Sequence, residues 1–160
     1  MSYYIRVLSH KKENVLLRDI CDHLVHKKIN FFIDSNLKST QLDNKNWKQF
    51  IITHNKEKKP LVLNRDVINA QKNNLVKEEI KEFLEEIENL LLTKEKKEIE
   101  KRLKQTNQIF SFQIPISDID NNDWNLVDSI IDFLVEKTEG FVQADKEGFY
   151  INKKLVLKTK

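Results

Sequence analysis

The sequence predicts an α+β fold with a mixed or mainly antiparallel sheet and helices packed on one face. Short β-prone segments follow one another directly, both before residue 66 and after residue 140, which is typical of hairpins. Amphipathic helical segments separate these groups, so the order mixes hairpins with crossovers and does not favour a doubly wound parallel fold. No Pro-, Gly- or Ser-rich seam divides the 160 residues, which predicts one domain over 1–160.

The first half of the chain predicts one helix among several strands. The opening segment alternates apolar and polar residues with period two, and the next repeats apolar residues every three or four positions. A polar loop then leads to a hairpin whose tip, Asn55 to Lys59, is expected to be solvated. The predicted elements are a strand Tyr3–Leu8, a helix Val15–Lys28, a strand Ile29–Asp34, and hairpin strands Trp47–His54 and Leu61–Leu63.

The second half predicts helices alternating with strands. Leu75 to Lys104 is one helix or two, because Thr93 followed by Glu95 offers a second N-cap. Asp123 is expected to cap a later helix, and Gly140 to end it in a left-handed conformation. The predicted strands are Ile109–Ile114, Phe141–Ala144, Phe149–Ile151 and Leu155–Leu157, with a turn at Gly148.

Composition limits the classes of function. Charged residues make up 33% and apolar residues 39%, and the formal net charge is +3, with lysines interleaved among glutamates. Because positive and negative side chains are mixed, the protein has no positive electrostatic potential over its whole surface that would attract a polyanion. A nucleic-acid partner is therefore not favoured. The single Cys21 excludes an internal disulfide framework, and no apolar run approaches the length of a membrane span. We therefore expect a cytoplasmic protein without a membrane partner.

Motifs for catalysis and cofactor binding are missing from the sequence. It contains two glycines, Gly140 and Gly148, whereas P-loop and dinucleotide-binding loops need several close together. No GxSxG elbow is present, and Cys21 falls on the apolar face of a predicted helix. We expect no catalytic residues and no cofactor.

Two clusters have the residue types of metal ligands. Asp19, His23 and His26 share one side of the first predicted helix, but a solvated polar face explains them better. The acidic residues near the last helix lack the glycine and the distal glutamate of a calcium loop, so helix capping is favoured. His54 is expected to be an ordinary strand-end residue. We therefore predict no metal site.

Two acidic segments are candidate partner-binding surfaces. Asp118, Asp120, Asp123 and Asp128 gather around Trp124, and an exposed tryptophan ringed by carboxylates suits a basic partner, unless the ring packs into the core. Asp145 and Glu147 lie beside a turn. They are candidates for the same surface, for an acid–base pair in a cleft, or for a solvated hairpin turn, which is favoured over the cleft.

The opening YYIRVLS and the segment FVQADKEGFY, after a capped amphipathic helix, resemble uncharacterised small bacterial α+β proteins of the immunity type. The resemblance implies a non-catalytic protein-binding domain, with a cognate toxin as its partner. Two alternatives remain open. One is a small enzyme whose carboxylates and histidines converge from separate segments. The other is a nucleic-acid-binding regulatory module that uses the lysines between Lys94 and Lys104.

Overall fold

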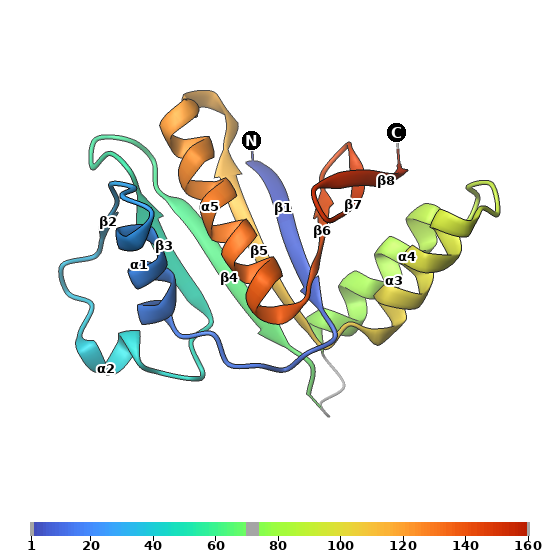
Figure 1. Cartoon of the computed structure of the whole chain (residues 1–160), viewed down its shortest axis with the longest axis horizontal. Coiled ribbons are helices and arrows are strands. Elements are labelled where there is room, and N and C mark those ends of the chain that lie inside the picture. Colours follow the sequence, from blue (N-terminus) through green and yellow to red (C-terminus); the bar gives the residue numbers. More distant parts are fainter. Residues whose placement is uncertain (1, 70–73, 160) are drawn as a thin grey trace.

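The computed structural model describes residues 2–69 and 74–159 and confirms the α+β fold class (Figure 1). Within these residues the strands form one antiparallel sheet in the order β2-β3-β4-β5-β1-β6-β7-β8. The strands are β1 (Ser2–Ser9), β2 (Phe32–Ile33), β3 (Gln49–Thr53), β4 (Leu61–Val67), β5 (Gln108–Pro115), β6 (Phe141–Ala144), β7 (Gly148–Ile151) and β8 (Lys154–Lys158). The helices are α1 (Leu17–His26), α2 (Ser39–Leu42), α3 (Leu75–Ile87), α4 (Lys94–Gln105) and α5 (Asn121–Thr138), with a 3-10 turn at Ile116–Asp118.

The first strand of the chain lies in the interior of the sheet. Along its whole length β1 pairs with β5, from Ser2 opposite Pro115 to Ser9 opposite Gln108. Its other edge pairs with β6, where Ile5 lies opposite Ala144. Neighbouring side chains of β1 point to opposite faces of the sheet, so this strand contributes to both sides of the molecule.

The larger core lies on the face covered by α1 and α5. Phe110 and Phe112 of β5 and Leu63 of β4 are at most 1% exposed and pack there against Ile20 and Ile130. Figure 1 shows both helices in front of this half of the sheet. The predicted packing of helices on one face therefore holds for α1 and α5.

The helices α3 and α4 lie on the other face, which the sequence did not predict. Phe83 and Ile99 contribute to a second core with Leu8, Phe141 and Phe149. Leu8 follows Val7 of the first core, as the alternation of a strand requires. In Figure 1 these two helices form a hairpin at the end of the sheet that carries β7 and β8.

Both predicted ends of α5 need correction. Asp120 is the N-cap, and Asp123 is the third helical residue of a capping box with it. At the other end Glu139, with φ 53°, takes the left-handed conformation expected of Gly140. A glycine is required at position 140 for a steric reason, because a Cβ there would lie 2.7 Å from Cγ1 of Val7.

Other elements differ in length from the prediction. The structure resolves residues 75–104 into two helices, and Thr93 caps the second by accepting a hydrogen bond from the Lys96 backbone N–H at 3.1 Å. The strand expected over 29–34 is reduced to Phe32–Ile33. The short helix α2 occupies a loop for which no element was predicted. No helix in the described ranges is long and apolar enough to cross a lipid bilayer.

Candidate functional site: an acidic groove beside an ionic clamp

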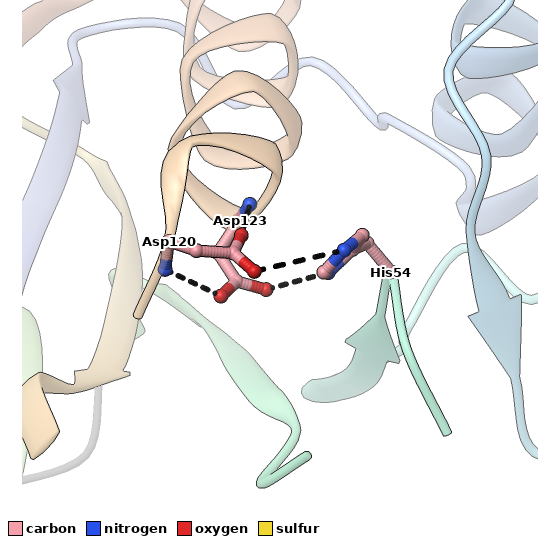
Figure 2. A group of neighbouring side chains, drawn as sticks. All are labelled: His54, Asp120 and Asp123. Atoms are coloured by element: carbon pink, nitrogen blue, oxygen red, sulfur yellow. Dashed lines mark hydrogen bonds and ion pairs between the residues drawn. The ribbon is translucent and has the colours of Figure 1, made fainter. Parts of the chain in front are cut away.

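Asp120 and Asp123 lie at the start of α5 and face the hairpin of β3 and β4 (Figure 2). His54 Nδ1 is 2.9 Å from Asp123 Oδ1. Lys58 Nζ donates to Asp123 Oδ2 at 2.6 Å and to Asp120 Oδ2 at 3.0 Å. Each carboxylate also accepts the backbone N–H of the other residue. We call His54, Lys58, Asp120 and Asp123 the clamp.

The clamp holds the hairpin tip against α5. The ligand-type atoms of His54, Asp120 and Asp123 lie within 4.8 Å of one another, a spacing that a metal ion would accept. The ammonium group of Lys58 already bridges the two carboxylates, and every carboxylate oxygen has a partner within the cluster. We therefore interpret the clamp as a structural link between the hairpin tip and α5. The tip is exposed at Lys56, Glu57 and Lys59, as expected, whereas its Lys58 is bound by α5. His54 binds Asp123 and is therefore not an ordinary strand-end residue.

The clamp predicts a specific acid sensitivity. The backbone N–H of Asp123, followed by Lys58, lowers the pKa of Asp120 from 3.8 to about 2. Since the folded-state pKa is depressed, the stabilisation is present above about pH 4 and is lost as the pH falls towards 2. Asp120→Asn keeps the cap but removes the charge, so we expect a lower melting temperature than wild type at pH 7 and a difference that shrinks to a small remainder near pH 2.

Thermal melts across that pH range measure the effect. Asp22→Asn, at an exposed acid on α1, is the matched control and should track the wild type. A gap between Asp120→Asn and wild type that stays constant with pH would contradict the clamp.

A groove of about 900 Å³ lies between α5 and the strands β6 and β7. Tyr3 and Ile5 of β1 line it, together with Val142 and Ala144 of β6. The side chains of both strands lie on the sheet face that α5 covers. The helix lies over β1 and β5, so the neighbouring part of this face, at β6, is left open. Trp124 stands on the helix wall, half-buried, with its ring edge-on to that of Tyr3 at 6.3 Å between centroids. The Trp124 side chain therefore packs partly against the core and partly lines the groove.

The helix wall of the groove carries a column of acids. Trp124, Asp128, Asp132 and Glu136 are each four residues apart and therefore lie in line along α5. Like charges at this spacing destabilise a helix. Lys153, in the turn between β7 and β8, reaches across to Asp132 at 3.2 Å. We call Asp128, Asp132 and Glu136 the acid column.

Two members of the acid column, Asp128 and Glu136, lack a partner. Within the described residues neither side chain accepts a hydrogen bond or forms an ion pair. Partial burial, followed by the charge of Asp132, raises the pKa of Asp128. Among the described residues that line the groove, five are acidic and two, Arg102 and Lys153, are basic. The groove is therefore apolar at its floor and acidic at its walls.

Glu147 lines the opposite wall of the groove and connects two tyrosines. The hydroxyl groups of Tyr3 and Tyr150 both donate to its carboxylate, the latter at 2.6 Å. Burial and the neighbouring Glu147 raise the pKa of Tyr3, and Glu147 raises that of Tyr150. Glu147 and Trp124, predicted from separate segments, therefore line the same groove.

Asp145 lies on the other face of the sheet. Its Oδ1 accepts a hydrogen bond from Arg6 Nη1 at 3.0 Å, whereas Glu147 binds Tyr3. Arg6 and Tyr3 differ by an odd number of positions in β1 and point to opposite faces. The two carboxylates of this turn do not converge, so the geometry does not support an acid–base pair.

The remaining sequence candidates lie apart from the groove. Asp118 is exposed in the 3-10 turn, and Asp120 and Asp123 belong to the clamp. His23 binds Ser129 of α5 at 3.2 Å and stacks on Phe133, while Asp19 accepts the Leu16 backbone N–H. Sequence reasoning missed Asp132 and Glu136 in the acid column, although their four-residue spacing from Trp124 is visible in the sequence.

Comparison of the chain with protein-family models, with curated proteins and with solved structures gave no match.

Proposed function

We propose that this chain is a non-catalytic protein-binding domain that receives a basic, partly apolar segment of another protein in the groove between α5 and β6–β7. The observation that carries the proposal is the acid column in line with Trp124. Aligned carboxylates cost the isolated helix stability, and the cationic side chains of a partner would offset that cost. An aromatic ring beside such charges is typical of an interface hot spot.

The dimensions and chemistry of the groove favour this kind of ligand. The groove has a volume of about 900 Å³ and is lined along α5 from Trp124 to Glu136, so it suits a short segment of chain. Asp128 offers an unpaired carboxylate, and the exposed pair of Lys153 with Asp132 is weak enough to exchange for a partner cation. Occlusion of a basic functional surface is the action that the proposed role as a toxin-neutralising immunity protein requires.

Selection of binding peptides from a random displayed library tests the groove directly. We expect the selected peptides to combine lysine or arginine with aliphatic or aromatic residues. Asp128→Arg should weaken their binding at least tenfold, which corresponds to about 1.4 kcal/mol. The same variant should be as stable as wild type, or more stable by roughly 0.2–0.5 kcal/mol, because it removes like-charge repulsion along the helix.

The matched control is Asp22→Arg, which reverses an exposed charge on α1 outside the groove and should leave binding unchanged. Asp120 and Asp123 are poor sites for this test because they support the clamp, so variants there change stability as well as binding. Selection of acidic peptides, or equal binding by Asp128→Arg, would refute the proposal.

A further inference from the structure

The uncovered part of the second sheet face carries a row of polar side chains. Gln49, Asn64, Ser111, Arg6 and Gln143 are in register across the five neighbouring strands β3, β4, β5, β1 and β6. Side chains in register on one face lie next to each other. Two hydrogen bonds join members of the row, from Gln49 Nε2 to Asn64 Oδ1 at 3.1 Å and from Arg6 Nη1 to Gln143 Oε1 at 2.7 Å.

Four members of the row, Gln49, Asn64, Ser111 and Arg6, form the floor of a cavity of about 500 Å³, which α3 borders on one side with Leu75 and Glu79. This volume lies within the range of about 300–1,000 Å³ that is usual for small-molecule sites. The cavity is separate from the groove of the proposed function, because it lies on the opposite face of the sheet.

Ser111, at the centre of the floor, offers a hydroxyl group to the cavity. The residue is 8% exposed, and its hydroxyl makes no hydrogen bond with any described residue. Its oxygen is not enclosed by the protein, so water or a ligand that enters the cavity can bind it. The side-chain amide nitrogen of neighbouring Asn64 likewise donates to no described acceptor.

Two opposite charges at the cavity are also unpaired. Asp66 of β4 and Lys48, just before β3, both line it, yet neither forms an ion pair or a side-chain hydrogen bond with the described residues. Burial raises the pKa of Asp66, and the charge of Lys48 opposes this shift without contact. The other charged pair, Arg6 with Glu79 at 3.1 Å, is already neutralised.

We infer that this cavity binds a small zwitterion of the amino-acid class, with its ammonium group at Asp66, its carboxylate at Lys48 and its polar atoms on Asn64 and Ser111. A ligand that carries both charges pairs both free groups at once. A simple amine or a simple carboxylate would leave one of them unpaired. Hydrogen bonds to Ser111 and Asn64 then favour a ligand that carries further polar atoms near its ammonium and carboxylate groups.

Amide NMR spectra recorded with each standard amino acid in turn test this inference. We expect at least one of them to shift the backbone signals of Ser111 and Asn64. The N-acetylated form of that amino acid should bind at least tenfold more weakly, because it lacks the ammonium group. Asp66→Asn should have a similar effect, and Lys48→Gln and Ser111→Ala should each weaken binding.

The spectra themselves show whether each variant is folded. Asp22→Asn is the control for charge removal outside the cavity, and Asp128→Arg should bind the amino acid like wild type because it alters only the groove on the other face. If no amino acid shifts the signals, or if Asp66→Asn binds as tightly as wild type, the cavity is a solvated sheet face and the inference fails.

Discussion

Replacing Phe112 with alanine is expected to lower the free energy of unfolding by about 3–5 kcal/mol, the usual cost of deleting a buried phenylalanine ring. Phe112 is 1% exposed and lies on β5, opposite Ile5 on one side and Leu63 on the other. Its removal opens a cavity at the centre of the larger core, which neighbouring strands cannot fill without breaking their register. Urea denaturation followed by circular dichroism measures the loss.

Phe32→Ala is the matched control. This ring is 40% exposed on the two-residue strand β2 and contacts the ammonium group of Lys56. Its loss should change stability by less than about 1 kcal/mol. Equal effects of the two substitutions would mean that the core is not centred on β5.

Replacing Gly148 with alanine is expected to destabilise the protein by roughly 2–4 kcal/mol, from backbone strain together with overpacking. Gly148 has φ +140°, a conformation that residues with a side chain rarely adopt. An added Cβ would also overlap the backbone carbonyl of Leu157 on β8. Because β7 and β8 pair there, we expect the terminal hairpin to separate from the sheet.

Hydrogen exchange of the amides in β7 and β8, compared with those in β5, locates this effect. Lys146→Gly, in the same turn, is the control, because Lys146 has φ 62° and glycine adopts that conformation freely. This substitution should be neutral or slightly stabilising. Protection of β8 in Gly148→Ala that equals wild type would contradict the predicted clash.

Periodicity predicted much of the fold because most elements have one apolar face. The alternation in β1 and β5 and the apolar stripe of α5 follow directly from the contacts they make. β4 extends beyond the predicted Leu63 to Val67, since its inner face continues through a polar residue, Arg65. Arg65 is buried, donates to Gln108 at 2.7 Å and lies over the ring of Trp47. A charged residue in a core position cannot be recognised from hydrophobic pattern alone.

The candidate sites were harder to predict because their residues meet only in three dimensions. The sequence identified Trp124 and Glu147, but Tyr3, from the opposite end of the chain, joins them. Lys58 and His54 reach Asp123 across more than 60 positions. The cavity on the second face depends on the register of the four strands β3, β4, β5 and β1, which no single segment specifies.

The central place of β1 also has a consequence for how the protein folds during synthesis. This strand leaves the ribosome long before its partners β5 and β6, which begin at residues 108 and 141. Native pairs as distant as Ile5 with Ala144 give the fold a high contact order, which slows folding. Until those partners are made, β1 has both hydrogen-bonding edges free. The nascent chain is therefore most prone to aggregation late in translation, while β5 and β6 are still missing and both edges of β1 are unpaired.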